Sequence, residues 1–391
     1  MSLRNKIRLL ALFNFFDAFR FSAAILIIYF ARVSGSYALG MSVFSINSIS
    51  QLVFDIPTGM ISDALGRKPV IICGAIASAG FTVFYAIGQN YWYLFAGAAI
   101  EGLARALYSG TRSALLYETL AEHDAVDRYA EYSGKINSLE PAAFAIAVLA
   151  GSVIAAYSFH LVFWVTLIPQ FFALCITLAI YEPKVVVRTK GTMVADLRES
   201  AAEFVHNRRL ALITLGTALR EAFGESAFQY QPAFYLTVWP TWALGIAGSL
   251  THAGSAVSFY LSGRVIARFQ ALRVLMGEII IGRAINAVAL IFATVVSPLL
   301  MSVTSLFYGP SQVARETLLQ QEFTERQRAT MGSVASQVSN VLFAVVAVLV
   351  GLCADRVGPI STLLLLQGLV LLPLWLYIRV FRHHSRSEER R

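Results

Sequence analysis

The chain has 391 residues, of which 57% are hydrophobic and only 14% are charged. Soluble proteins average about 45–50% apolar and about 25% charged residues, so this composition excludes a soluble globular protein and indicates one embedded in lipid. The net charge of +8 follows from membrane topology, as shown below, and we infer no nucleic-acid partner from it. The three cysteines lie in or at the ends of apolar runs, and they predict neither a disulfide framework nor a metal site.

Long apolar runs follow one another along the whole chain. A helix that crosses a membrane needs about 20 mostly apolar residues. Twelve runs meet this requirement and predict an all-α membrane protein with twelve transmembrane helices. They lie near residues 9–31, 38–58, 69–88, 92–116, 133–157, 159–180, 211–236, 242–262, 272–295, 298–319, 331–353 and 359–378. The first run lacks the small-residue cleavage site of a signal peptide, so we expect it to remain as the first helix.

One long polar stretch, residues 182–209, divides the runs into six plus six. The predicted domains are therefore an N-terminal six-helix bundle (1–181), a cytoplasmic linker (182–209), a C-terminal six-helix bundle (210–378) and a basic tail (379–391). Within the linker, apolar residues recur at helical spacing among charges. This pattern fits either a short helix lying on the membrane surface or a solvated linker helix.

The distribution of lysine and arginine predicts the orientation. With twelve spans, both termini share one side with the loops that follow even-numbered helices. Nearly all loop lysines and arginines fall on that side, and the other side carries little beyond Arg32 and Arg356. Because positive loops stay in the cytoplasm, we expect both termini to be cytoplasmic.

A short internal repeat relates the two halves. Residues 118–120 read Glu-Thr-Leu, and residues 316–318 read the same. At the same offset, Asp-Arg at 127–128 corresponds to Glu-Arg at 325–326. Both copies fall between the fourth and fifth spans of their half, which is the pattern expected of two six-helix bundles related by pseudo-symmetry.

The most specific segment is residues 59–69, Gly-Met-Ile-Ser-Asp-Ala-Leu-Gly-Arg-Lys-Pro, between the second and third apolar runs. A charged turn cannot lie in hydrocarbon, so it must connect two spans at a membrane face. Asp63 and Arg67 are four residues apart and can pair if a helical turn continues there. The segment resembles the loop signature Gly-x-x-x-Asp-Arg-x-Gly-Arg-Lys/Arg of the major facilitator superfamily, with Ala64 in place of the first arginine.

This resemblance implies a secondary transporter with a cytoplasmic gate. In the superfamily, an acid at the cytoplasmic end of the fourth helix joins the aspartate and arginine of the loop, and here Glu118 stands at that end. The gating residues implied are Gly59, Asp63, Gly66, Arg67, Lys68 and Glu118. The alternative is a surface ion pair that contributes at most about 1 kcal/mol to stability and has no role beyond keeping the loop on the cytoplasmic side.

Charged and polar residues inside the spans are functional candidates, because each charge in hydrocarbon costs at least about 2.5–3.5 kcal/mol. They are Asn14, Asp17 and Arg20 in the first span, Glu101 and Arg105 in the fourth, Glu140 in the fifth, Arg220, Glu221 and Glu225 in the seventh, and Glu278 and Arg283 in the ninth. Helical spacing predicts three pairs that share a face. These pairs are Asp17 with Arg20, Glu101 with Arg105, and Glu221 with Glu225. The alternative is that they form internal salt bridges that only fix packing.

Helices one, four, seven and ten line the central cavity in the superfamily that this chain resembles. Asp17 is the leading candidate for the proton carrier, because a buried carboxylate can load and release a proton near neutral pH. Glu221 and Glu225 form a second possible proton site or a seat for a cation, and Glu140 is a further candidate. The predicted cavity residues are Asn14, Arg20, Glu101, Arg105, Tyr108, Arg220, Tyr230, Gln231 and Phe307.

The stretch Ser109–Glu118 is similar to the fourth helix of compact bacterial efflux permeases. This similarity implies a monomeric, proton-coupled exporter of drugs or small metabolites in the bacterial inner membrane, driven by the proton gradient without a cofactor. The Gly-Pro-x-x-Gly-Gly motif of many drug–proton antiporters is absent, since residues 139–143 read Leu-Glu-Pro-Ala-Ala. The alternative is an uptake symporter or facilitator for a small solute, which the embedded arginines allow to be anionic. An enzyme is disfavoured, because the sequence shows no phosphate-binding loop, metal-ligand cluster or nucleophile–base set.

Overall fold

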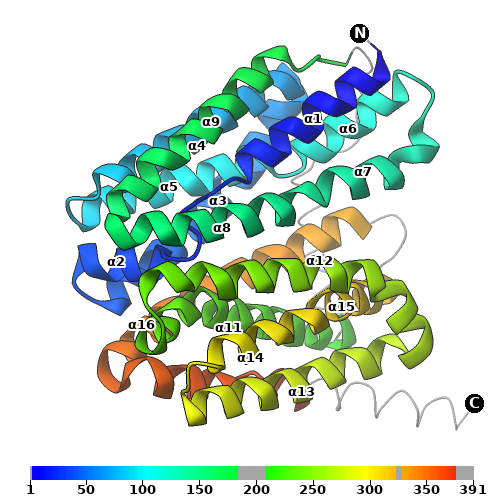
Figure 1. Cartoon of the computed structure of the whole chain (residues 1–391). Helices are drawn as coiled ribbons and strands as arrows, with labels where there is room; N and C mark the ends of the chain where they lie inside the picture. The colour runs from blue at the N-terminus through cyan, green and yellow to red at the C-terminus, as the bar shows by residue number, and fades with distance from the viewer. Residues whose placement is uncertain (1, 184–207, 323–327, 376–391) are drawn as a thin grey trace, which may run out of the picture. The chain divides into compact units, whose positions relative to one another are not determined.

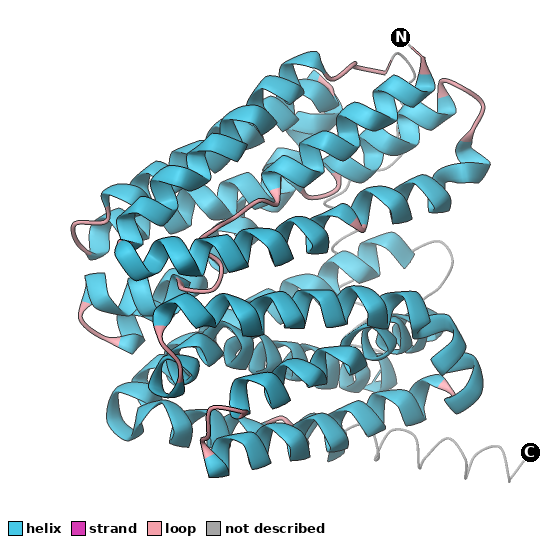
Figure 2. Cartoon of the chain, in the orientation of Figure 1, coloured by secondary structure: helices cyan, strands magenta, loops and turns pink. Residues whose placement is uncertain are grey.

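The computed structural model describes residues 2–183, 208–322 and 328–375. In these ranges the chain consists of α-helices with short 3-10 turns and contains no strand (Figure 2). The all-α prediction is therefore confirmed. The predicted linker helix and the basic tail fall mostly outside the described ranges, so the domain boundaries stay predictions.

The first half of the chain contains nine α-helices in the described residues (Figure 1). They are α1 (Leu3–Asp17), α2 (Leu26–Ser34), α3 (Tyr37–Leu65), α4 (Arg67–Ile87), α5 (Tyr91–Tyr108), α6 (Thr111–Ala121), α7 (Tyr129–Asn137), α8 (Leu139–Tyr157) and α9 (Phe159–Ala179). The second half contains α11 (Arg208–Val238), α12 (Leu244–Phe269), α13 (Ala271–Phe292), α14 (Ser297–Val303), the 3-10 helix η3 (Thr304–Phe307), α15 (Tyr308–Glu322) and α16 (Arg328–Leu369).

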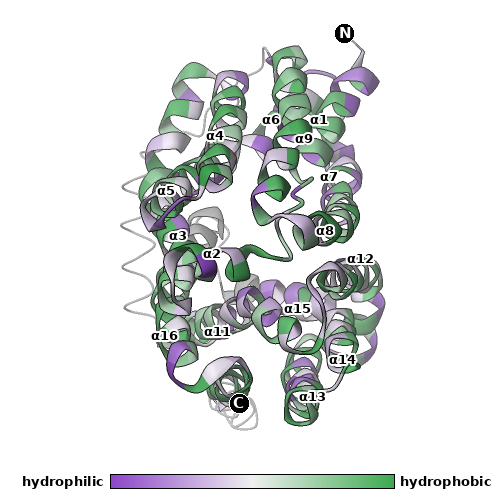
Figure 3. Cartoon of the chain, turned by 60° about the vertical axis from the view of Figure 1, so that its left-hand side comes forward, coloured by the Kyte–Doolittle hydropathy of each residue, from purple (hydrophilic) through white to green (hydrophobic). Residues whose placement is uncertain are grey.

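Apolar residues predominate along these helices (Figure 3). Within the described residues, six helices are long and apolar enough to cross a membrane by length and composition. They are Tyr37–Leu65, Arg67–Ile87, Glu131–Tyr157, Phe159–Ala179, Ala271–Phe292 and Val334–Trp375. Large apolar side chains also remain on the outside of the bundles, among them Trp92 and Phe171, which are 70% and 62% exposed. Hydrocarbon rather than water suits such a surface.

Several predicted spans are broken rather than continuous. The first span consists of α1 and α2 with a non-helical segment at residues 18–25 between them. The fourth span breaks between α5 and α6, where Gly110 takes a φ of +69° that other residues rarely adopt. The tenth span is divided by η3, and α16 contains a kink at Gly358 between the eleventh and twelfth predicted spans. Broken helices at membrane depth are typical of transporters, because freed backbone groups are tolerated where protein or a cavity surrounds them.

The chain forms two compact units, which we describe separately. One comprises Met1–Thr189 with Tyr235–Ala253, and the other comprises Lys190–Phe234 with Gly254–Arg391. In the first unit α3 and α5 pack closely, because a Cβ on Gly102 of α5 would collide with the carbonyl oxygen of Asn47. The hydroxyl of Ser50 donates to the carbonyl oxygen of Ala99 across the same contact, at 2.6 Å. Small residues that bring backbones together are the usual means of helix association in lipid.

Candidate functional site

Asp17 is the last residue of α1 and is 5% exposed. Its Oδ2 accepts a hydrogen bond from Arg112 Nη2 at 2.5 Å, and its Oδ1 accepts one from the hydroxyl of Tyr108 at 3.3 Å. Arg112 also donates to Oδ1 of Asn14, one turn earlier on α1, at 3.0 Å. Asp17, Asn14 and Tyr108 were candidates from the sequence, and the structure brings them together around Arg112.

Arg112 was missed by the sequence analysis. It lies in the first turn of α6, directly after the break at Gly110. Its guanidinium stacks on the ring of Tyr108 with 3.9 Å to the ring centroid, and it also lies 4.9 Å from the ring centroid of Phe13. A cation held on two aromatic faces beside a carboxylate is well positioned for a buried ion pair. Its place inside the stretch Ser109–Glu118 was the signal that could have identified it.

The predicted Asp17–Arg20 pair is wrong. Spacing of three residues brings side chains together only in a continuous helix, whereas α1 ends at Asp17 and Arg20 lies in the segment 18–25. Arg20 instead contacts Glu101 of α5, with Nη1 at 3.3 Å from Oε1.

Glu101 is the centre of a second cluster in the same unit and is 8% exposed. Arg105, one turn later on α5, contacts Oε1 of Glu101 through Nη2 at 3.0 Å, as its spacing predicted. The hydroxyl of Tyr85 donates to Oε2 at 3.0 Å. With Arg20 also on Oε1, this carboxylate is shared by two guanidinium groups.

In the other unit, Glu221 of α11 forms an ion pair with Arg315 of α15 and accepts a hydrogen bond from the hydroxyl of Ser339. Glu225 accepts a hydrogen bond from the side-chain amide of Gln229 at 2.7 Å. The two acids thus have separate hydrogen-bonding and ionic partners. Arg315, like Arg112, comes from the fourth span of its half and was missed.

Arg220 precedes Glu221 on α11 and contacts another acid. Its Nη2 lies 2.6 Å from Oε2 of Glu278 on α13 and donates to the hydroxyl of Ser311 at 2.8 Å. Arg283 contacts the other oxygen of Glu278 at 3.7 Å. The carboxylate of Glu278, like that of Glu101, therefore forms ion pairs with two arginines.

The loop between α3 and α4 forms the charge cluster that the motif predicted. Arg67 Nη1 lies 2.7 Å from Oδ1 of Asp63, and its Nε and Nη2 lie 3.1 and 3.0 Å from Oε1 of Glu118. Arg67 Nη1 also donates to the hydroxyl of Ser62 at 2.9 Å. This arginine thus joins α3 to α6 from the first turn of α4.

Glu182 completes the cluster and was missed, because its position in a polar stretch suggested only a linker. Its carboxylate accepts hydrogen bonds from the backbone N–H groups of Arg67 at 2.7 Å and Lys68 at 2.5 Å. It therefore caps the N-terminus of α4, where unpaired N–H groups favour an anion. A Cβ on Gly66 would lie 2.6 Å from Oε1 of Glu182, which explains the glycine at this position together with its φ of +96°.

The other candidates lie apart from these clusters. Glu140 is exposed in the first turn of α8. Tyr230 is fully buried in α11, whereas Gln231 and Phe307 are half-buried. Gly59 lies inside α3, and Lys68 Nζ donates to the carbonyl oxygen of Leu178 at 2.8 Å. In the part of the chain that the structure describes, no group of His, Cys, Asp and Glu could hold a metal ion.

Apolar spanning helices that enclose ion pairs and are broken at their polar positions are typical of multi-pass membrane transporters. The model of the Major Facilitator Superfamily matches residues 9–347. The chain belongs to this superfamily, and its fold is the twelve-helix major facilitator fold.

Curated relatives match over a limited stretch. The inner membrane transport protein YajR of Escherichia coli K12 is 30% identical over 135 residues, which are 34% of this chain and 28% of that protein. The multidrug resistance protein MdtH of Edwardsiella ictaluri is 31% identical over 110 residues, 27% of this chain and 25% of that protein. The chain thus matches only about a quarter of the length of these relatives.

Solved structures match over nearly the whole chain. The nucleoside transporter NupG has a TM-score of 0.79 at 15% identity, and the match covers 97% of this chain and 99% of that structure. A bacterial homologue of the human lysosomal transporter Spinster has a TM-score of 0.77 at 14% identity, covering 97% and 96%. At such low identity these matches establish the fold alone.

Proposed function

We propose that the protein is a proton-coupled exporter of drugs or small metabolites that works as a monomer by alternating access. In this proposal it lies in the bacterial inner membrane with both termini in the cytoplasm, and the proton gradient is its energy source, without a cofactor. The single observation that carries the proposal is the ion pair of the buried Asp17 with Arg112, at the broken ends of the first and fourth spans.

The chemistry of this pair supports proton coupling. Arg112 compensates the charge of Asp17 while the carboxylate is ionised, and Tyr108 donates a hydrogen bond to it. A proton on Asp17 cancels the attraction and releases the guanidinium, which is a change in charge and packing that can bias a two-state carrier. Glu140, in the first turn of α8, is a further candidate for the proton carrier.

Glu221 and Arg315 repeat this arrangement in the C-terminal unit. In each half, an acid on the first span is paired with an arginine on the fourth, and these spans line the substrate cavity in the superfamily. We therefore assign Glu221 the same role as Asp17. In the export cycle, substrate enters from the cytoplasm while the acids are ionised, and protons from outside displace it.

Export is supported by the relatives named as multidrug resistance proteins, although they match about a quarter of their length. The second candidate is an uptake symporter or facilitator for an anionic solute. The observation that favours it is the carboxylate of Glu101, which is shared by Arg20 and Arg105. One negative charge between two guanidinium groups leaves a net positive charge, which suits an anion.

The test is accumulation of fluorescent cations and labelled organic anions in cells that lack their own efflux pumps. We expect the wild-type protein to lower the accumulation of one class of probe. Asp17→Asn should reduce the rate of export at least about tenfold, since proton-transfer steps typically contribute about 100-fold or more. A protonophore should restore accumulation in the same way. Glu131→Gln is the control, because Glu131 is exposed and pairs only with Arg128 and Lys135 in the described structure.

Full activity of Asp17→Asn, at wild-type expression, would exclude Asp17 as the proton carrier. Higher accumulation in cells that express the protein would reverse the direction and favour the uptake symporter.

A further inference from the structure

Asp55 is an acid inside the second span that the proposed export cycle does not use. It lies in α3, eight positions before Asp63 of the cytoplasmic charge cluster. At 1.5 Å per residue, this separation is about 12 Å along the helix axis. The interfacial layer on each side of a hydrocarbon core is only about 5–8 Å thick, so Asp55 lies at the depth of hydrocarbon. It was not among the candidates from the sequence.

The carboxyl group of Asp55 faces the broken fourth span. One turn later on α3, Thr58 Oγ1 donates to the carbonyl oxygen of Ala106 on α5 at 3.1 Å. Asp55 is half-buried beside this contact, and its carboxylate accepts a hydrogen bond from the hydroxyl of Ser109. Ser109 is the residue at which α5 ends and the break before α6 begins.

Asp55 has no arginine partner in the described part of the chain. There, burial and the hydroxyl of Ser109 are the influences on its carboxyl group, and no ion pair includes it. Four other embedded acids each contact at least one guanidinium, namely Asp17, Glu101, Glu221 and Glu278.

The cations on the helices that pack beside Asp55 are engaged elsewhere. Arg105 of α5 and Arg112 of α6 contact the acids described above. Arg67, in the first turn of α4, belongs to the charge cluster of the loop. Within the described ranges, none of these groups acts on Asp55.

These surroundings suit a carboxyl group that gains and loses a proton. Burial without a cation favours the neutral, protonated form, because a bare charge is costly in hydrocarbon. The hydrogen bond from Ser109 favours the ionised form, because a carboxylate is the stronger acceptor. A proton carrier must adopt both forms, and Asp55 has one stabilising influence for each.

The break also offers a route for the proton. Ser109 and Gly110 are exposed, and a Cβ built on Gly110 would meet nothing within 4 Å. The side chain of Arg105, one turn before Ser109, is 49% exposed. A polar and open surface of this kind suits water rather than lipid.

We propose that Asp55 is a proton-binding residue whose protonation controls the break between α5 and α6, with Ser109 as the positioning residue. For its part in transport, this inference rests on the proposed proton-coupled function. The ionised carboxylate holds Ser109 by a charge-assisted hydrogen bond and so fastens the break to α3. A proton on Asp55 weakens that bond and loosens the break three residues before Arg112, the partner of Asp17.

Labelling of the purified full-length protein with dicyclohexylcarbodiimide in detergent tests the site. This apolar reagent adds to a protonated carboxyl group, and the adduct rearranges to a stable acylurea that peptide mass spectrometry locates. We expect Asp55 to be labelled in mildly acidic buffer and the labelling to disappear as the pH is raised. Asp127, in the exposed turn after α6, is the comparison within the same protein and should stay unlabelled.

Ser109→Ala tests the hydrogen bond through the pH profile. The variant lacks the hydroxyl that stabilises the ionised carboxylate, so the protonated form is favoured. Labelling of Asp55 should then persist to about one pH unit higher than in the wild type. Ser138→Ala is the matched control, because the hydroxyl of Ser138 donates to the carbonyl oxygen of Lys135. Its profile should equal that of the wild type.

Amide hydrogen exchange tests the link to the break. Asp55→Asn imitates the protonated state and should speed exchange at residues 109–112 at least about threefold, since a hydrogen bond to a charged group is roughly twice as strong as a neutral one. Asp127→Asn is the matched control and should exchange as the wild type does.

An Asp55 that is unlabelled in folded protein, or labelled equally at every pH, would overturn the proposal. Unchanged exchange at the break in both Asp55→Asn and Ser109→Ala would refute its control of the break. Labelling and exchange need no gradient and no substrate, so they judge Asp55 separately from the proposed export. Failure of the wild type to use the proton gradient would count against the proposed function alone.

Discussion

Arg112 and Arg315 supply the partners of Asp17 and Glu221, and each does so from the fourth span of its own half. The arginines nearest in sequence do not pair with these acids. Helix α1 ends at Asp17, so Arg20 does not share its helical face, and Arg220, next to Glu221, pairs with Glu278 instead. Each acid is thus tied to a helix that lies far from it in the chain. A proton on either acid therefore loosens a contact between helices rather than one within a helix.

The pair of Glu221 and Arg315 allows a test of this coupling by a double mutant. Glu221→Gln removes the negative charge that faces Arg315, whose side chain is 10% exposed. Breaking a buried pair from one side typically costs about 3–5 kcal/mol of unfolding free energy, because it leaves an uncompensated charge. Because the Glu221 side chain is 30% exposed, solvent screens part of this cost, and we expect the single variant to be destabilised by about 1–2 kcal/mol and Glu221→Gln/Arg315→Gln to recover most of the loss. Denaturant unfolding in detergent measures both, and an additive double mutant would show that the two groups are not coupled.

A cluster beside the gate predicts a pH dependence of stability. Lys6 Nζ donates to Oε2 of Glu122 at 2.6 Å and lies 3.6 Å from the ring centroid of Tyr181, whose hydroxyl donates to Oε1 of Glu122 at 3.0 Å. The hydrogen bond from Lys6 is the main cause that lowers the pKa of Glu122 from its ordinary value. The folded protein therefore favours the ionised carboxylate.

A lowered pKa in the folded state means that the stabilisation is present above the unfolded pKa, about 4.3 for glutamate. It is lost as the pH falls through the lower folded pKa. Glu122 is near the surface, so its contribution is at most about 1 kcal/mol. Comparison of wild type with Glu122→Gln should show this difference at neutral pH and none in strong acid. A difference that stays constant with pH would contradict the assignment.

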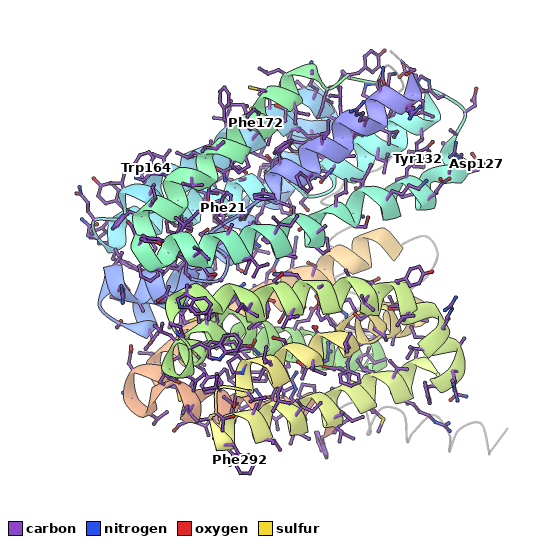
Figure 4. All side chains as sticks on the ribbon, viewed as in Figure 1. Phe21, Asp127, Tyr132, Trp164, Phe172 and Phe292 are labelled. Atoms are coloured by element: carbon purple, nitrogen blue, oxygen red, sulfur yellow. The ribbon has the colours of Figure 1, made fainter. Side chains whose placement is uncertain are left out.

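At the scale of elements, the break in the first span is supported by α8. Phe21 lies in the segment between α1 and α2 (Figure 4). A Cβ on Gly151 of α8 would collide with the carbonyl oxygen of Phe21. The glycine thus allows α8 to lie directly against the backbone of the break.

Gly151→Ala tests this contact. The added methyl group must displace the backbone at Phe21, and overpacking of this kind typically costs about 1–3 kcal/mol. We expect a lower thermal unfolding temperature in detergent. Gly134→Ala in α7 is the matched control, because a Cβ there meets nothing within 4 Å. Equal unfolding temperatures for the two variants would show that the break does not depend on α8.

At the scale of the whole molecule, Arg67 tests the gate that the superfamily motif implies. Arg67→Gln removes the charge that joins Asp63 to Glu118 but leaves the backbone N–H that Glu182 caps. In the proposed cycle this cluster stabilises one end state, so turnover should fall about tenfold or more while substrate binding is retained. Transport in proteoliposomes and binding to purified protein measure the two effects.

Arg128→Gln is the control for this experiment, because Arg128 pairs with Glu131 on the surface. Wild-type turnover of Arg67→Gln would show that the cluster serves only to connect α3, α4 and α6.

The spans were predictable because a helix that crosses the hydrocarbon core must have a certain length and an apolar composition, and both can be read directly from the sequence. Asp63 and Arg67 pair as their spacing suggested, but they do so across the turn at Gly66, because α3 ends at Leu65 and α4 begins at Arg67. The break in the first span was not predictable, because residues 18–25 are mostly apolar and the backbone contact with Gly151 of α8 leaves no pattern in the sequence. For the same reason the arginine partners were missed: a pair between distant helices leaves no periodic pattern in the sequence.

The broken first span also has a consequence for biosynthesis. Neither α1, with 15 residues, nor α2, with 9, is long enough to cross a bilayer, and at and after the end of α1 the chain carries Asp17 and Arg20. A segment of this kind is poorly recognised by an insertion machinery that reads hydrophobicity. The groups that neutralise its charges, Glu101 and Arg112, are synthesised only with the fourth span. We therefore expect the first span to be stably inserted in the membrane only after the fourth span has been synthesised. The first span is then among the last of its half to reach its final position.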